Sequence, residues 1–265
     1  MGEPGEQELL DVAVAAARAA ADELLARFGQ RPRDVQVKSS PTDLVSEADV
    51  EAEHAVRAVL AERRPRDPVL GEEGGDVSVV AEEAAGGSLQ WVVDPLDGTI
   101  NFLFGIPLFA VSVACEDADG AVAGVVLDPV RDECFAATRT GDALLNGETI
   151  RSSQRDELAT AMVATGFGYD AAFRAQQAAV VARVLPQVRD IRRCGAAALD
   201  LAWTACGRFD AYYERGLKRW DLAAGGLIAT RAGLEMRELA AGGEDAAGVV
   251  VAPPRLIDGL YGLVV

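Results

Sequence analysis

The stretch LQWVVDPLDGT, residues 89–99, sets two carboxylates, Asp94 and Asp97, directly after a short apolar run. An apolar run that ends in Asp, Pro and Gly is typical of a buried strand followed by a turn. Left bare, two carboxylates so close in the chain would repel each other and raise each other's pKa, whereas a shared divalent cation would keep both ionised. Asp, Pro and Gly are also ordinary turn residues, so a plain turn explains this stretch taken alone.

Further acidic side chains stand at the ends of other expected elements. The pair Glu72-Glu73 follows a second short apolar run, and Asp221 opens an expected helix over residues 221–232, whose N-terminal dipole favours an anion. Asp49 ends the sequence SEAD, residues 46–49, which is typical of a helix N-terminus. Taken singly, Glu72-Glu73 fits a solvated loop, Asp221 fits an N-cap and Asp49 fits a capping box. Together they supply only oxygen ligands, which favour Mg²⁺ or Mn²⁺ over zinc or copper.

The composition excludes several classes of protein. The 265 residues are half apolar and a quarter charged, as in a folded chain of one or two domains. The 42 Asp and Glu against 25 Lys and Arg give a net charge of −17, which disfavours nonspecific nucleic-acid binding. With His54 as the single histidine, most histidine-based catalysis is excluded. The absence of a C-x-x-C pair, a secretory signal and a membrane-length apolar stretch predicts a cytoplasmic protein with reduced thiols.

The apolar periodicity predicts two halves of different construction. Residues 1–150 begin with two helices, over 6–28 and from Ser46 to Arg64, followed by β-rich runs, so an α+β half with an antiparallel sheet is expected. Strands and helices alternate over residues 151–265, which predicts an α/β half. The expected strands are 35–38, 69–70, 89–93, 108–116, 121–127, 133–138, 162–165, one near 191, and 209–214; further helices are expected over 172–184, 197–206 and 221–232, and a mobile loop over 74–88.

Six pieces of sequence, taken in their order and spacing, resemble the inositol monophosphatase family. They are KSSPTDLVSEAD (38–49), GEE (71–73), WVVDPLDGTINF (91–102), DAYYE (210–214), Gly216, and WDLAAG (220–225). The resemblance runs from about residue 7 to the C-terminus. It implies the layered αβαβα sandwich shared with fructose-1,6-bisphosphatases. It also implies Mg²⁺-dependent hydrolysis of phosphate monoesters of small polyols, inhibition by Li⁺, and a homodimer.

The resemblance also implies which residues hold the metal ions. Two or three Mg²⁺ ions are expected, with Mn²⁺ as an alternative. Glu72, Asp94 and the backbone carbonyl of Leu96 match the first metal site. Asp94, Asp97 and Asp221 match the second, so Asp94 bridges the two. A third, weaker ion is expected near Glu72, with Glu73 in a supporting role.

The catalytic and substrate-binding roles are carried over in the same way. Glu72 and the Thr99 hydroxyl, which Asp49 orients, match the catalytic residues that activate a water molecule, and Lys38 matches a supporting cation. Asp97, the backbone N–H groups of Gly98 and Thr99, the wall Gly195-Ala196 and Glu214 match substrate contacts. The chain departs from many relatives at Ala196-Ala197-Ala198, where they carry Ser or Thr, so a hydroxyl contact is missing here.

The expected function is that of a phosphoric monoester hydrolase acting on inositol 1-phosphate, with no nucleic-acid or membrane partner. Two alternatives stay open: the same chemistry on histidinol phosphate, fructose 1,6-bisphosphate or a phosphoadenosine nucleotide, and a catalytically idle module that binds a macromolecule. The cluster Arg215, Lys218 and Arg219 fits either a solvated rim or substrate steering. The stretch GFGYDA, residues 166–171, partly matches a dinucleotide fingerprint, but no acidic partner follows it, so it carries little weight.

Overall fold

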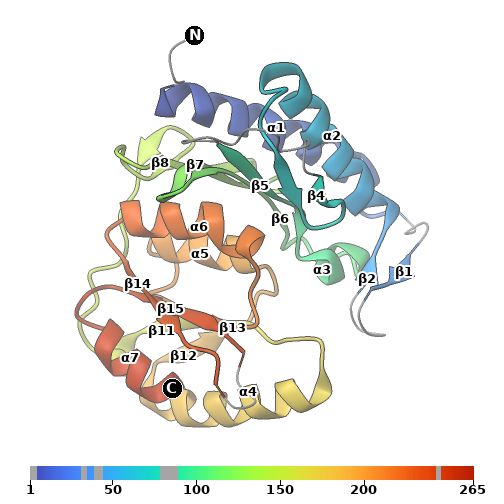
Figure 1. Ribbon diagram of the computed structural model, residues 1–265. Coiled ribbons are helices and arrows are strands. Elements are labelled where there is room, and N and C mark those ends of the chain that lie inside the picture. The colour runs from blue at the N-terminus through green and yellow to red at the C-terminus, as the bar shows by residue number, and fades with distance from the viewer. Residues whose placement is uncertain (1–4, 31–34, 39–43, 78–88, 243–245) are drawn as a thin grey trace.

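The protein is built of five layers, helices and sheets in alternation (Figure 1). The computed structural model describes residues 5–30, 35–38, 44–77, 89–242 and 246–265. Helices α1 (Glu6–Arg27) and α2 (Glu47–Arg63) cover the outer face of an eight-stranded sheet. Helices α5 (Ala197–Ala205) and α6 (Arg219–Arg231) separate that sheet from a five-stranded one. Helices α4 (Ala171–Val184) and α7 (Ile257–Val264) close the far side. The expected α/β sandwich is therefore confirmed.

The eight-stranded sheet has the strand order β10-β9-β8-β7-β6-β5-β3-β4. Its neighbours pair antiparallel except β3 and β5, which run parallel. The strands are β3 (Val69–Gly71), β4 (Gly75–Val77), β5 (Gln90–Asp97), β6 (Ala110–Asp117), β7 (Gly120–Asp128), β8 (Glu133–Thr138), β9 (Leu144–Leu145) and β10 (Glu148–Thr149). A separate pair joins β1 (Gln36–Val37) to β2 (Leu44–Val45), and the short helix α3 (Thr99–Leu103) follows β5.

The five-stranded sheet is mixed and has the order β12-β11-β13-β15-β14. β12 and β13 lie parallel to β11, whereas β15 runs antiparallel to both β13 and β14. The strands are β11 (Met162–Thr165), β12 (Asp190–Arg192), β13 (Ala211–Arg215), β14 (Glu235–Leu239) and β15 (Gly248–Ala252), with 3₁₀ turns at Leu158–Thr160 and Leu185–Gln187.

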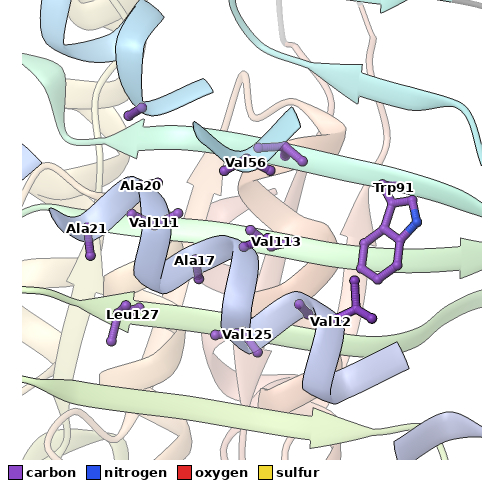
Figure 2. Packing of buried hydrophobic residues seen from close by; sticks show 14 of the residues in the cluster. Val12, Ala17, Ala20, Ala21, Val56, Trp91, Val111, Val113, Val125 and Leu127 are labelled. Carbon is purple, nitrogen blue, oxygen red and sulfur yellow. The ribbon is translucent and has the colours of Figure 1, made fainter. Parts of the chain in front are cut away.

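Small residues let the layers approach closely. In Figure 2 the alanines of α1, Ala17 among them, face the valines of β6 and β7. Trp91 of β5 is fully buried in the same cluster. On the other face of the sheet, a Cβ added to Gly124 of β7 would lie 2.9 Å from the Cα of Ala224, so glycine there admits α6. Because α5 and α6 are covered on both sides, they are apolar around most of their circumference.

The structure corrects four local expectations. β5 continues beyond Val93 to Asp97, so the two carboxylates lie within the strand. Helix α6 begins at Arg219 rather than at Asp221. Residues Gly75–Val77 form β4, because they pair with β3, whereas residues 78–88 of the expected loop lie outside the described residues. β14, β15 and α7 were not expected. The division into halves at residue 150 stays a prediction.

Candidate functional site

A cavity of ≈ 620 Å³ gathers the residues that the sequence singled out. It is lined by residues from the C-terminal end of β5, in the eight-stranded sheet, and from the segments around β11, β13 and the start of α6. Its lining includes Lys38, Glu72, Asp94, Leu96, Asp97, Gly98, Thr99, Gly195, Ala196, Glu214 and Asp221. Asp49 and Glu73 do not line the cavity but contact residues that do. Residues from both halves of the chain therefore share one space.

The end of β5 is irregular, and the irregularity places Asp94 and Asp97. The pairing of β5 with β6 shifts register between these two residues, which is a β-bulge. Asp94 is 2% exposed, and its Oδ1 accepts the backbone N–H of Leu96 at 3.0 Å. Gly98 has φ +96°, and a Cβ there would lie 2.9 Å from the carbonyl oxygen of Leu108. Only glycine allows the chain to turn here from strand into α3.

Asp49 performs two tasks at the start of α2. Its Oδ2 accepts the backbone N–H and the hydroxyl of Ser46, at 2.8 and 2.7 Å, which completes the capping box. Its Oδ1 lies 2.8 Å from the hydroxyl oxygen of Thr99, which is also 3.1 Å from the carbonyl oxygen of Leu96. Burial raises the pKa of Asp49. Asp49 therefore caps α2 and also contacts the Thr99 hydroxyl, and its catalytic role stays a prediction.

Lys38 joins the two glutamates of the turn between β3 and β4. Its Nζ lies 2.9 Å from Glu72 Oε1 and 2.5 Å from Glu73 Oε1. Burial by itself lowers the pKa of Lys38, but the two glutamates outweigh it and raise that pKa. For Glu73, an acid, burial acts in the opposite direction and raises the pKa to about 7. The Lys38 ammonium group thus holds both carboxylates beside the cavity.

Asp97 links the two halves of the chain. Its two oxygens accept the backbone N–H groups of Ala197, Ala198 and Leu199, at 2.9, 2.8 and 3.2 Å, at the start of α5. Asp221, the third residue of α6, accepts the N–H of Lys218 at 2.6 Å. Burial raises the pKa of both Asp97 and Asp221 to about 7. Both carboxylates therefore cap helices while they line the cavity.

Another part of the cavity lining carries aromatic side chains. It is formed by Phe167, Tyr169, Phe173 and Arg193, which we call the aromatic wall. The guanidinium of Arg193 lies 5.8 Å from the ring centroid of Phe167. The carboxylate wall, by contrast, consists of Glu72, Asp94, Asp97, Thr99 and Asp221.

Glu214 also lines the cavity. Its Oε2 accepts the hydroxyl of Tyr212 at 2.8 Å. Burial raises the pKa of Glu214 to about 7. A Cβ on Gly166 would lie 2.0 Å from the same oxygen, so the glycine makes room for this carboxylate.

The donor set of the cavity fits a hard divalent cation. Burial is the largest cause that raises the pKa of Asp94 well above its usual value, and repulsion by Glu72, Asp97 and Asp221 adds to it. Four mutually repelling carboxylates in a buried space are stabilised by a cation, and oxygen ligands suit Mg²⁺. Within the described residues, no three acidic, histidine or cysteine side chains are positioned together to hold a metal ion. Backbone N–H groups hold oxygens of Asp97 and Asp221, and Lys38 holds one of Glu72. Coordination would therefore require these side chains to reorient locally.

The basic cluster Arg215, Lys218 and Arg219 is divided between the cavity and the rest of the fold. Lys218 of the basic cluster lines the cavity, whereas Arg219 pairs with Glu116 and Arg215 binds the backbone carbonyls of Ala240 and Ala246. His54 is exposed on α2. The four cysteines are free. Among the described residues, no helix is both long enough and apolar enough for a membrane span.

Sequence reasoning missed the aromatic wall and one buried carboxylate, Glu53. The stretch 166–171, discounted as a weak nucleotide motif, supplies part of the aromatic wall. Its run of glycines and aromatic residues after a strand was the available signal. Glu53 lies four residues after Asp49 on α2, which puts both side chains on the same face of the helix. That spacing was the signal for Glu53.

Comparisons with known proteins find similar sequences and structures. The sequence model of the inositol monophosphatase family matches residues 6–262. Inositol-1-monophosphatase SuhB of Mycobacterium tuberculosis is 45% identical over 216 residues, which cover 79% of this chain and 73% of that protein. Nus factor SuhB of Pseudomonas aeruginosa is 43% identical over 235 residues, 86% and 84% of the two chains. The crystal structure of extragenic suppressor protein suhB from Bartonella henselae superposes with a TM-score of 0.86 at 34% identity, covering 97% of this chain and 98% of that one.

Proposed function

This chain belongs to the inositol monophosphatase family, and from that premise we propose that it is a Mg²⁺-dependent phosphatase. Its substrate is inositol 1-phosphate or a similar small polyol monophosphate, and its products are the free alcohol and inorganic phosphate. One observation carries the proposal: four carboxylates and the Thr99 hydroxyl held by Asp49 line one cavity. The proposal includes inhibition by Li⁺, a homodimer and a cytoplasmic location.

The metal-binding roles follow from the donor set. Glu72, Asp94 and the carbonyl of Leu96 would hold one Mg²⁺. Asp94, Asp97 and Asp221 would hold a second. A third, weaker ion would lie near Glu72 with Glu73 in support, and Mn²⁺ can replace Mg²⁺. When bound, such ions neutralise phosphoryl oxygens and lower the pKa of a coordinated water molecule.

The protein's own residues would orient and deprotonate that water. The Thr99 hydroxyl, when it donates its proton to Asp49 at 2.8 Å, keeps its lone pairs free to accept a proton from water. Asp49 is itself fixed by two bonds from Ser46, so the pair is preorganised. Glu72, held by Lys38, completes the catalytic set.

Substrate binding would use groups on both sides of the reacting phosphate. The backbone N–H groups of Gly98 and Thr99, at the start of α3, would bind the phosphate. Glu214 and Asp97 would accept hydrogen bonds from polyol hydroxyls, and the Gly195-Ala196 wall would flank the ring. Asp97 also binds the N–H groups at the start of α5, directly after Gly195-Ala196. One side chain therefore links this segment to the proposed metal site.

A second candidate function rests on the names of two relatives. Proteins of Pseudomonas aeruginosa and Xylella fastidiosa, 43% and 39% identical, are called Nus factor SuhB. A role as a partner-binding factor, with or without catalysis, is therefore the alternative. The intact set of carboxylates argues against a version that has lost catalysis. The net charge of −17 argues against direct nonspecific binding of nucleic acid.

A substrate panel separates these functions. Purified protein would be assayed on inositol 1-phosphate, histidinol phosphate, fructose 1,6-bisphosphate and a phosphoadenosine nucleotide, with Mg²⁺, with a chelator, and with added Li⁺. We expect the highest kcat/KM on inositol 1-phosphate, dependence on Mg²⁺ and inhibition by Li⁺. A tenfold preference for another ester, about 1.4 kcal/mol, would reassign the substrate. No phosphate release from any ester would end the enzymatic proposal and favour the partner-binding role.

A further inference from the structure

Glu53 is a buried carboxylate beside the cavity that none of the roles above uses. It lies on α2, is 2% exposed, and its Oε1 is 2.7 Å from Nε of Arg57. Its Oε2 accepts the backbone N–H of Glu73 at 2.9 Å, and its Oε1 accepts that of Gly74 at 3.0 Å. Both donors belong to the turn between β3 and β4, which carries Glu72.

The turn has been shaped to receive this side chain. A Cβ on Gly71 would lie 2.6 Å from Glu53 Oε2, and one on Gly74 would lie 2.5 Å from Oε1. Both glycines therefore leave the space that the carboxylate occupies. The N–H of Glu72 itself donates to the carbonyl of Val93 on β5, at 3.2 Å. In this turn the sheet therefore binds the N–H of Glu72, and Glu53 accepts the N–H groups of Glu73 and Gly74.

We propose that Glu53 is a positioning residue for metal binding, acting by fixing the backbone that aims Glu72 into the cavity. This inference rests on the proposed function, in which Glu72 is a metal ligand. A flexible turn would have to be ordered when the metal binds, and that cost would weaken the affinity. When Glu53 and the sheet already order the turn, metal binding does not carry this ordering cost.

Helix α2 then sets the spacing of the whole site. Asp49 and Glu53 are one helical turn apart on one face. The first holds the Thr99 hydroxyl and the second holds the Glu72 turn. The distance between the Thr99 hydroxyl and the Glu72 turn is thereby set by one rigid helix rather than by two independent loops.

Asp128 offers a matched control for this proposal. It is also fully buried, its Oδ1 accepts two backbone N–H groups of a turn, those of Val130 and Arg131 at 3.0 and 3.1 Å, and it pairs with an arginine. It belongs to the hairpin between β7 and β8 and does not line the cavity. Asp128→Asn therefore removes the charge of a buried carboxylate that pairs with an arginine and holds a turn, without touching the Glu72 turn.

The test measures Mn²⁺ binding to the metal-free full chain by calorimetric titration for the wild type, Glu53→Gln, Glu53→Asp and Asp128→Asn. A glutamine offers one acceptor and two donors, so one N–H of the turn faces another donor. We expect Glu53→Gln to weaken Mn²⁺ binding about 10- to 100-fold, as is typical for groups that support metal ligands. Glu53→Asp should lie between it and the wild type. Asp128→Asn should lower the melting temperature yet bind Mn²⁺ like the wild type.

A second measurement separates positioning from catalysis. The Mg²⁺ concentration for half-maximal phosphate release should rise with the loss of affinity, whereas kcat at saturating Mg²⁺ should stay within about threefold of the wild type. Wild-type Mn²⁺ affinity in Glu53→Gln overturns the proposal. If Glu53→Gln does not fold, wild-type affinity in Glu53→Asp overturns it instead. If the wild type binds no Mn²⁺, the proposed function fails, and the role of Glu53 falls with it.

Discussion

The two walls of the cavity are built in opposite ways. In the carboxylate wall, Asp94 and Asp97 are buried and accept backbone N–H groups, from Leu96 and from α5, and Lys38 holds Glu72. The aromatic wall consists of larger side chains that are partly exposed, and Tyr169 is 43% exposed. A side chain fixed by several hydrogen bonds keeps a reaction geometry, whereas an exposed aromatic surface tolerates different leaving groups. Under the proposed function, the chemistry would be fixed on the carboxylate wall and the choice of ester would be made on the aromatic wall.

Neutralising Asp94 would break the carboxylate wall most completely. In Asp94→Asn a ligand that the proposal shares between two ions is lost, and metal catalysis is worth several kcal/mol, so we expect kcat to fall on the order of 10³-fold. The fold should persist, because burial already favours the uncharged form of Asp94 in the metal-free protein. Phosphate release and circular dichroism measure the two effects. Turnover equal to the wild type would show that Asp94 is not catalytic.

Removing the Thr99 hydroxyl should have the next largest effect. Thr99→Ala deletes the group that Asp49 holds at 2.8 Å, and general base catalysis contributes about 10²-fold or more, so we expect kcat to drop by about that factor with little change in KM. Thr99→Ser should retain most of the activity. Thr204→Ala, which removes a buried hydroxyl bond on α5, is the control for a purely structural loss. Equal kcat values for the alanine and serine variants would contradict the proposed role.

The dependence of metal-induced stabilisation on pH tests the electrostatics of the carboxylate wall and of Glu214. Burial raises the pKa of Asp97, Asp221 and Glu214 to about 7 in the folded metal-free protein, above 3.8, 3.8 and 4.5. Their contribution to the free energy of unfolding is therefore complete below about pH 4 and is lost as the pH rises through 7. Bound Mg²⁺ favours the ionised forms and should offset that loss.

The measurement is the melting temperature with and without Mg²⁺, against NaCl of equal ionic strength. At pH 8, Mg²⁺ at about 100 times its Kd should add about 2.7 kcal/mol, roughly 5 to 10 °C for a chain of this size. At pH 5 the shift should nearly vanish. Equal shifts at both pH values would mean that these carboxylates do not bind the ion.

A change on the aromatic wall should have the smallest effect and should sharpen the comparison. An aromatic contact is worth about 0.5 to 1.5 kcal/mol, so Tyr169→Ala should change the ratio of kcat/KM between two esters by about two- to tenfold. The Mg²⁺ dependence should not move. Tyr261→Ala, on α7 and away from the cavity lining, is the matched control. An altered Mg²⁺ requirement in Tyr169→Ala would show that the two walls are not independent.

Local patterns in the sequence predicted most elements and grouped the acidic residues. The expected strand over 133–138 and that over 162–165 match β8 and β11 to the residue, because alternation and turn residues act over a few positions. β14 was missed although its burial alternates, since it forms only by pairing with β15 at the sheet edge. β4 was missed for the same reason, because its pairing with β3 outweighs a glycine-rich composition.

The sequence alone determined that this chain carries an acidic, oxygen-rich set of ligands at strand and helix ends in the order of one enzyme family. Only the tertiary structure decided that Asp97 reaches the N–H groups of α5 about a hundred residues away, and that Glu53 holds the Glu72 turn. Residue type and spacing encode backbone preference and burial, which are local. Which donor meets which acceptor across the layers depends on how whole helices and sheets pack, and that is settled only when the layers come together.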